Sequence, residues 1–259
     1  MDWHVVWERI AHPDHIFFVA LTRTIYIAVI AQVMGVILGL VAALMRMSRI
    51  APLRWLSGIY IWIFRGTPLL VQIYFIYYGS NDLLGFNVIP NTLNLGLFSL
   101  DGAIVAGILA LGVNEGAYMR EIIRAGIDSV DKGQMEAAKS LGMRYGLAMR
   151  RIVLPQAARV IVPPLGNEFN NMMKTTSLVY TIGVYELFAD AEQGYAQTFH
   201  PEYFVAVAFW YLVLTTVWTF LQAAIERRLA ASERGDRLGF RERLTAAWNP
   251  MTAWGRGAR

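Results

Sequence analysis

Residues 161–182 read IVPPLGNEFNNMMKTTSLVYTI, and the placement of this stretch decides the fold of the chain. It is long enough for a membrane-spanning helix, which needs about 20 residues to cross about 30 Å of hydrocarbon. It also contains asparagines, a glutamate, a lysine and a Thr-Thr-Ser run, so a hydropathy filter rejects it. The sequence on either side of it therefore has to show whether it crosses.

The flanking segments differ sharply in positive charge. Lysine and arginine are absent from 79–101 and 186–203, whereas three lie in 46–54, eight in 119–159 and eight in 226–259. Because cytoplasmic loops of membrane proteins are enriched in these residues, the basic segments are expected in the cytoplasm and the other two outside. The chain must then cross the membrane between 119–159 and 186–203, which places a helix over the quoted stretch.

Four further windows are apolar enough to span a bilayer. The second of them carries Arg65, Gly66 and Pro68, which predict a kink or a partly unwound stretch, because proline removes a helix hydrogen bond. With the quoted stretch, the windows predict an all-α membrane protein with five transmembrane helices, the N-terminus outside and the C-terminus in the cytoplasm. The first window is expected to act as an uncleaved anchor, since the N-terminus lacks a signal-peptide pattern. The windows are Ile25–Met45, Trp55–Tyr78, Gly102–Tyr118 and Tyr203–Ile225.

The composition agrees with a membrane protein and excludes several other classes. Hydrophobic residues make up 56% of the chain and charged residues 16%, against about 25% in soluble domains. The absence of cysteine excludes a disulfide scaffold and a catalytic thiol, and the four histidines have no metal-site spacing, so we expect no bound metal. The chain lacks a GxxxxGKS/T sequence, so we expect neither a nucleotide site nor enzymatic activity of its own. The formal charge of +4 reflects the loop asymmetry and does not indicate a nucleic-acid partner.

A polar stripe runs along the quoted stretch. Its amides and its ammonium recur at i, i+3, i+4 and i+7, a spacing that places them on one face of a helix. An ionisable group inside a membrane costs about 2.5 to 3.5 kcal/mol and normally faces a bundle interior or a wet cavity. We therefore expect the stripe to line a pathway for a polar zwitterion; the alternative is that these groups only bond neighbouring helices. The stripe and the groups beside it are Asn167, Glu168, Asn170, Asn171, Lys174, Thr175 and Ser177.

Two more candidate pathway residues lie on or beside the third window. Asn114 and Glu121 are seven positions apart, with Tyr118 between them, so they share a helix face. Glu121 lies close to the expected cytoplasmic end of the helix. Pairing with Arg120 or Arg124 is the alternative to a pathway role for this carboxylate.

Arg65, near the middle of the second window, is a further pathway candidate. A guanidinium at this depth needs a partner or wet surroundings. An ion pair with Glu115 or Glu168 is the alternative to a role in transport. The role of Glu115 itself is left open.

The longest basic loop contains QMEAAKSLGMRYGLAMRRIVLPQA at 134–157. Its pattern predicts a short helix that begins near Gln134, a break at Gly142, a second amphipathic helix over about 144–153 and a stop before Pro155. Two short helices joined by a turn would form a compact surface on the cytoplasmic face. We expect another protein to dock there.

This loop resembles the EAA motif of ABC-importer permeases, which has the form EAA-x3-G-x9-I-x-LP. Every defining position matches, and the resemblance covers about residues 17–230. Four further segments are similar to the polar amino-acid branch of these permeases, the histidine, glutamine and glutamate permeases. They are FRGTPLLVQIYFIYYG (64–79), GAYMREIIRAGI (116–127), LPQAARVIVPPLGNEF (154–169) and KTTSLVYTIGVYEL (174–187).

The resemblance implies a type I ABC-importer permease, a subunit that forms the translocation pathway for a polar amino acid. It implies a cytoplasmic ATPase that binds ATP and Mg, a second permease subunit, the same or homologous, and an external or periplasmic substrate-binding protein. It places the chain in the bacterial inner membrane as a multi-pass protein. Which amino acid is carried, and whether the two permeases are identical, stay open.

The resemblance also assigns ATPase-coupling residues. In the family the EAA helix inserts into a groove of the ATPase, so Glu136 would meet basic or backbone donors there. Ala137 and Ala138 would permit close approach, because they carry little side-chain bulk. Gly142 would supply the bend, because glycine adopts backbone angles that other residues resist. The remaining motif positions are Ile152, Leu154 and Pro155.

The chain is expected to have two regions, a transmembrane permease domain over 17–230 and a basic tail over 231–259; the first includes the coupling loop at 120–159. The arginines and tryptophans of the tail indicate a surface-lying or disordered segment attracted to anionic membrane lipid. The alternative function is an ion-coupled secondary amino-acid transporter or channel, which has no use for the coupling loop. A non-transporting scaffold for the ATPase leaves the polar stripe unexplained.

Overall fold

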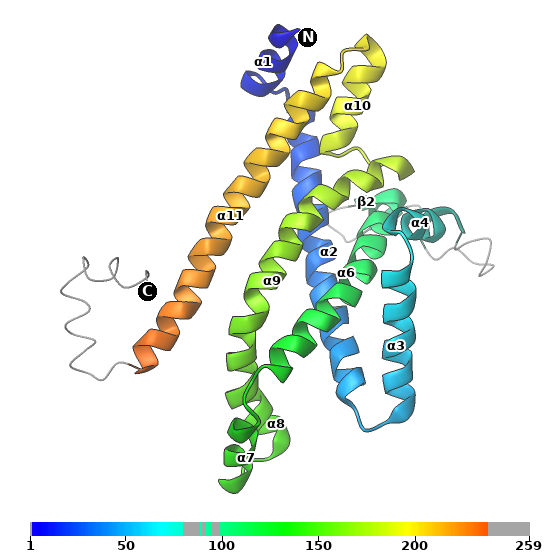
Figure 1. Cartoon of the computed structure of the whole chain (residues 1–259). Coiled ribbons are helices and arrows are strands. Elements are labelled where there is room, and N and C mark those ends of the chain that lie inside the picture. Colours follow the sequence, from blue (N-terminus) through cyan, green and yellow to red (C-terminus); the bar gives the residue numbers. More distant parts are fainter. Residues whose placement is uncertain (1, 80–88, 90–91, 95–98, 238–259) are drawn as a thin grey trace, which may run out of the picture.

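The structure, a computed structural model, describes residues 2–79, 89, 92–94 and 99–237. Its elements are α1 (Trp3–Ala11), α2 (His15–Met47), α3 (Ala51–Gly66), α4 (Leu69–Tyr74), η1 (Phe75–Gly79), β1 (Thr92–Asn94), β2 (Ser99–Asp101), α6 (Gly102–Asp128), α7 (Lys132–Ser140), α8 (Tyr145–Ala148), η2 (Met149–Val153), α9 (Leu154–Thr175), η3 (Thr176–Ile182), α10 (Leu187–Thr198) and α11 (Glu202–Arg237). The long helices pack lengthwise into a bundle (Figure 1). α1 and α10 lie at one end of the bundle, whereas α7, α8 and the turn between α2 and α3 lie at the other.

Three of the predicted windows lie inside single helices that extend beyond them. α2, α6 and α11 contain the first, third and fourth windows and are long and apolar enough to cross a membrane. α6 continues to Asp128, ten residues beyond the end of the apolar window at Tyr118. Its polar end is stabilised by pairs between side chains three and four positions apart, in which Arg124 contacts Glu121 and Asp128.

The second window is not one straight span. α3 ends at Gly66, α4 begins at Leu69, and the helix axes meet at an angle of 107°. Pro68 has no amide hydrogen, so the carbonyl of Phe64 loses its helical donor and the helix ends. The predicted break is confirmed, and the two helices pass the length and hydropathy test for a span only when they are taken together.

The stretch 161–182 is helical and is divided between α9 and η3. α9 begins earlier than predicted, at Leu154, and passes through Pro163 and Pro164. The winding then tightens into the 3-10 helix η3, which ends at Gly183 with a left-handed φ of 87°. α9 packs against α2, α6 and α11, while its side chains Asn167, Asn171 and Lys174 are exposed. Its crossing of the membrane, and with it the number of spans and the orientation, stays a prediction.

The loop between α6 and α9 differs from the prediction at its far end. α7 and the turn at Gly142 lie where the sequence placed them, but the predicted stop before Pro155 is wrong. α8 passes into the π-helix η2, which continues directly into α9. Pro155 occupies the first turn of α9, where a missing amide hydrogen is tolerated. No break therefore separates the end of the loop from α9.

The core is built around the contact between α2 and α6. A Cβ atom at Gly39 of α2 would collide with Met119 of α6, so glycine allows the two helices to approach closely. The largest apolar cluster joins α2, α6 and η3 through the buried side chains of Ile27, Leu111 and Val179. These contacts fix the positions of the helices that carry the polar residues.

A buried carboxylate joins three helices at the α1–α10 end. Glu186, between η3 and α10, accepts hydrogen bonds from the amides of Phe188 (2.9 Å) and Ala189 (3.0 Å) and so caps α10. The hydroxyls of Thr24 on α2 (3.3 Å) and Tyr211 on α11 (3.0 Å) donate to its other oxygen. Burial raises the pKa of this carboxyl above its ordinary value.

The described residues add one small sheet to the helical architecture. β1 and β2 form an antiparallel hairpin in which Thr92 pairs with Asp101, within the segment 79–101 that was expected outside. At the other end of the chain, α11 continues past 230 to Arg237. The rest of the predicted basic tail, 238–259, lies outside the described residues.

Candidate functional site

A polar cavity of about 690 Å³ lies between α4, α6, α9 and η3. Four apolar side chains line it, namely Leu69, Leu111, Met172 and Leu178. The remaining lining combines two carboxylates, one ammonium, two amides and three hydroxyls. These groups belong to Asn114, Glu115, Tyr118, Glu168, Asn171, Lys174, Thr175 and Ser177. Such a mixture of charges and hydrogen-bonding groups suits a small polar ligand.

Six of the ten predicted pathway residues line this cavity, and four do not. Asn167 contacts α11, where its Oδ1 accepts a hydrogen bond from Nε2 of Gln222 (3.3 Å). Asn170 is half-buried and lies outside the lining. The stripe therefore splits, because a helical face that includes i, i+3, i+4 and i+7 is wide enough to meet both α6 and α11.

Arg65 is exposed and lies against an aromatic ring. Its guanidinium carbon is 5.2 Å from the ring centroid of Tyr118, which itself lines the cavity. None of the ion pairs between described residues joins it to Glu115 or Glu168. The cation–π contact thus places Arg65 beside the cavity rather than in it.

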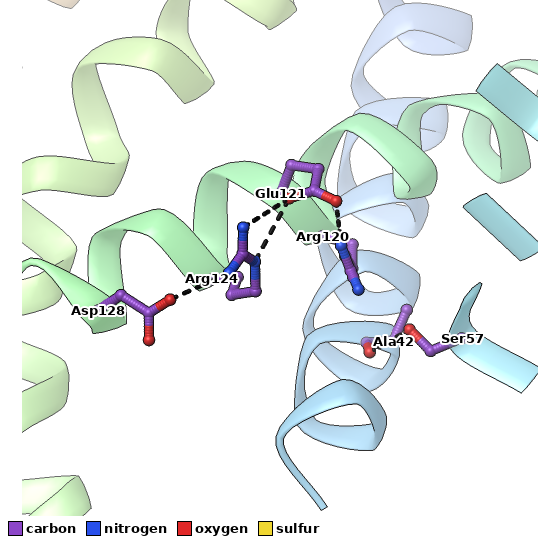
Figure 2. A network of polar contacts seen from close by, with 6 residues as sticks. All are labelled: Ala42, Ser57, Arg120, Glu121, Arg124 and Asp128. Atoms are coloured by element: carbon purple, nitrogen blue, oxygen red, sulfur yellow. Dashed lines mark hydrogen bonds and ion pairs between the residues drawn. The ribbon is translucent and has the colours of Figure 1, made fainter. Parts of the chain in front are cut away.

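Glu121 belongs to a charge network at the far end of α6. Figure 2 shows its carboxylate between Arg120 and Arg124, with Asp128 further along the helix. The Arg124 guanidinium bridges Glu121 (3.4 Å) and Asp128 (3.3 Å). The alternative of pairing with the neighbouring arginines is thus what the structure shows, and Glu121 does not line the cavity.

Asn114 connects the cavity to the break between α3 and α4. Its Nδ2 donates to the carbonyl of Phe64 (3.0 Å) and to Oε1 of Gln72 (3.0 Å). Nε2 of Gln72 donates to the same Phe64 carbonyl (2.9 Å) and to the Thr67 hydroxyl (2.8 Å). Two side-chain amides therefore replace the donor that Pro68 removes. Gln72 was not among the predicted pathway residues, although an amide four residues after a helix-breaking proline is a recognisable signal.

Glu115 is buried at the wall of the cavity. Its Oε1 accepts a hydrogen bond from Nε2 of Gln32 on α2 (2.9 Å), a residue that interrupts the first apolar window and was not among the predicted pathway residues. Among the described residues, no ion pair includes Glu115, Glu168 or Lys174. The cavity therefore presents charges of both signs that have no ionic partner within this part of the chain.

The motif loop ends its first helix with a Schellman turn. The amide of Met143 donates to the carbonyl of Ala138 (3.0 Å), and the amide of Gly142 donates to the carbonyl of Lys139 (2.9 Å). Gly142 has a φ of 78°, in the left-handed region where glycine is strongly preferred. The motif glycine is thus required by the backbone of the turn.

The tip formed by α7 and α8 is exposed on one side and attached to the bundle on the other. Glu136 and Ala137 are exposed, and Leu141 is 83% exposed, so they present a surface with an apolar tip. Ala138 is buried within the chain. Met135 and Met149 pack on the second apolar cluster, which joins α6 to η2 and α9. The other motif residues, Ile152, Leu154 and Pro155, lie in η2 and the first turn of α9.

A helical bundle with a polar cavity and an exposed helical tip defines a membrane transport component. Residues 35–231 match the family described as "Binding-protein-dependent transport system inner membrane component". The chain belongs to this family. The expectation of an ABC-importer permease is confirmed.

Relatives and a solved structure agree with this assignment. The arginine transport system permease protein ArgU of Corynebacterium glutamicum is 39% identical over 236 residues, which cover 88% of this chain and 72% of that protein. The L-cystine transport system permease protein TcyB of Bacillus subtilis is 40% identical over 208 residues, 80% of this chain and 83% of that protein. The crystal structure of an amino acid ABC transporter with histidines superposes with a TM-score of 0.74 at 39% identity and covers 88% of this chain and 99% of that chain.

Proposed function

We propose that this permease forms the translocation pathway for a polar amino acid. The observation that carries the proposal is the cavity between α4, α6, α9 and η3, with its charges of both signs. Lys174 would pair with the substrate carboxylate, and Glu168 or Glu115 with its amino group. The amides and hydroxyls of the lining would bind the polar side chain. Acidic, amide and basic side chains are all compatible with this lining, and relatives are named for arginine and for cystine.

Transport would be driven by a cytoplasmic ATPase that binds ATP and Mg, since the chain carries no nucleotide-binding motif of its own. The ATPase would seat on the exposed tip, where Glu136, Ala137 and Gly142 belong to the contacting loop. Because η2 continues into α9 without a break, a displacement of the tip would move α9. α9 carries Asn171 and Lys174 into the cavity. Nucleotide at the tip would thereby bias the cavity between two states.

Two further partners would complete the importer. A second permease subunit, the same or homologous, would form the other half of the pathway. An external substrate-binding protein would deliver the amino acid to the α1–α10 end. We place the chain in the bacterial inner membrane as a multi-pass protein, with the basic α7–α8 end in the cytoplasm.

Reconstitution with the ATPase and the binding protein tests the pathway. Lys174→Leu and Asn171→Leu remove groups that would contact substrate, so the substrate concentration for half-maximal ATP hydrolysis is expected to rise about tenfold or more. Asn167→Leu is the matched control, because Asn167 faces Gln222 on α11 and is expected to leave this concentration unchanged.

The same vesicles test the mode of coupling. Glu136→Arg and Gly142→Pro should abolish stimulation of hydrolysis by substrate while the chain still inserts and assembles. Unchanged stimulation in both variants contradicts the coupling assignment, and unchanged affinity in the Lys174 and Asn171 variants contradicts the pathway. Uptake without ATPase, driven by a proton or sodium gradient, would instead support the ion-coupled alternative.

A further inference from the structure

A second cavity, of about 380 Å³, lies at the turn between α2 and α3. This turn is at the end of the bundle that carries α7 and α8 (Figure 1). The cavity shares no lining residue with the polar cavity described above. Its lining consists of Arg46, Arg54, Trp55, Gly58, Ile59 and Trp62.

Two arginines supply all the charge in this lining. Nη1 of Arg54 donates to the carbonyls of Ser48 (3.2 Å) and Arg49 (2.9 Å), which holds the guanidinium in place. A guanidinium has five N–H donors, so further donors remain for a ligand. No lining residue is acidic, and none of the ion pairs between described residues includes Arg46 or Arg54. The charge of this cavity therefore favours binding of an anion.

The other part of the lining is apolar and exposed. Trp55, Ile59 and Trp62 follow one another at i, i+4 and i+7 along one face of α3, and the two tryptophans are 73% and 76% exposed. Trp62 lies eight positions after Arg54, which is about 12 Å further along the helix axis at 1.5 Å per residue. A Cβ at Gly58 would meet nothing within 4 Å, so the space between the rings is open. The cavity thus has a cationic end and an apolar wall that extends away from it.

We infer that this cavity binds one anionic glycerophospholipid from the leaflet at the α7–α8 end. The phosphodiester accepts hydrogen bonds from Arg46 and Arg54, and the acyl chains lie on Trp55, Ile59 and Trp62. A soluble anion would pair with the arginines but would leave the exposed tryptophan side chains uncovered. An anionic amphiphile satisfies both, and basic pockets at helix ends are a recurring form of lipid site.

Native mass spectrometry of the full-length chain in its transporter complex tests the site. The complex is released from nanodiscs that contain equal amounts of phosphatidylglycerol and phosphatidylcholine, and the retained lipid is counted. An arginine near an anionic surface is worth about fivefold in binding, so the double variant Arg46→Gln, Arg54→Gln is expected to lose about thirtyfold in preference for phosphatidylglycerol. Arg49→Gln is the matched control: this arginine is exposed, lies in the same turn and does not line the cavity.

Three outcomes would overturn the inference. The first is equal retention of phosphatidylglycerol by the wild-type protein and the double variant. The second is binding of inorganic phosphate alone with the same dependence on both arginines, which assigns a free anion to the site. The third uses the variant Gly58→Cys, which introduces a single cysteine because the natural chain has none. Efficient cross-linking between two copies of this variant in native membranes would assign a second subunit to this surface. Loss of phosphatidylglycerol in the double variant but not in the control, without cross-linking, supports the lipid.

Discussion

Side-chain amides hold the backbone together where α3 breaks. Pro68 removes the donor for the Phe64 carbonyl, and Gln72 and Asn114 both replace it. Because Asn114 also lines the cavity, the residue that stabilises the bend is one that would contact substrate. Gln72 does not line the cavity, so a substitution at Gln72 tests the stability of the bend without removing a group that would contact substrate.

Gln72→Leu is expected to destabilise the bend. The substitution removes the hydrogen bonds of Gln72 with Phe64, Thr67 and Asn114, and each such bond contributes about 0.5 to 1.5 kcal/mol. The melting temperature of the purified protein should fall by several degrees. Gln197→Leu, at an exposed position of α10, is the control and should melt like the wild type. Equal melting temperatures for both variants would show that Gln72 does not support the bend.

Glu186 makes part of the stability depend on pH. Burial raises the pKa of its carboxyl, so the folded protein keeps this proton at pH values where the unfolded chain has lost it. Its contribution to stability is therefore greatest at or below the ordinary glutamate pKa and declines as the pH rises toward the raised value. Glu186→Gln cannot titrate, and its amide can still accept from Phe188 and Ala189. Between about pH 5 and about pH 8, its melting temperature should fall less than that of the wild type. Parallel curves would contradict this assignment.

The types of residue that line the cavity can be predicted from the sequence, whereas the residues that they contact cannot. A row of amides and a lysine in a membrane segment is expected to face the bundle interior or a wet cavity, and Asn171 and Lys174 do line the cavity. Spacing alone could not show that Asn167 faces α11 and not the cavity, because tertiary packing decides which helices lie on either side of α9. The Gln32–Glu115 hydrogen bond joins residues 83 positions apart, so no local pattern reports it.

At the scale of elements, the Schellman turn after α7 makes a sharp prediction. A residue with a Cβ at Gly142 is strained by about 1 to 2 kcal/mol at its φ of 78°, so Gly142→Ala should loosen the end of α7. Hydrogen exchange of the amides of residues 141–143 should become faster. Gly146→Ala is the matched control, since Gly146 lies in α8 with open space around it and no positive φ. Similar exchange in the two variants would contradict a requirement for glycine at 142.

Element boundaries were predicted where a single residue decides them. Gly142 ends α7 and Pro68 ends α3, as local chemistry requires. The predicted stop before Pro155 was wrong because a proline in the first turn of a helix is tolerated, and Pro163 and Pro164 inside α9 do not end it either. Whether a proline lies inside a helix or at its start depends on what precedes it. Here that is a π-helix, which the sequence pattern did not indicate.

At the scale of the whole molecule, charge asymmetry predicts the orientation. The α7–α8 end is expected in the cytoplasm and the α1–α10 end outside. Because the chain has no cysteine, single cysteines report this directly. In intact cells, an impermeant maleimide should label Gln197→Cys on α10 and should label Leu141→Cys only after permeabilisation; both positions are exposed. The reverse pattern would invert the topology and move the ATPase to the other end.

Loop charge and hydrophobic length indicated a bundle of long helices, and the family resemblance indicated its class. Neither showed how the helices are arranged. The close contact of α2 with α6, the capping of α10 by Glu186 and the attachment of α7 to the second apolar cluster join residues far apart in the chain. Such contacts depend on which helices become neighbours. A single sequence carries little information on that choice.

The composition of α9 has a consequence for the biogenesis of the protein. α9 and η3 are not among the helices of the described chain that are apolar enough to enter a bilayer on their own. α9 packs against α2, α6 and α11, with Asn167 hydrogen-bonded to Gln222 of α11, and α11 is the last of these helices to be synthesised. A nascent chain that ends near residue 182 should therefore leave this segment outside the lipid. Its insertion would wait for α11, so the helix that carries the pathway residues would be the last to enter the membrane.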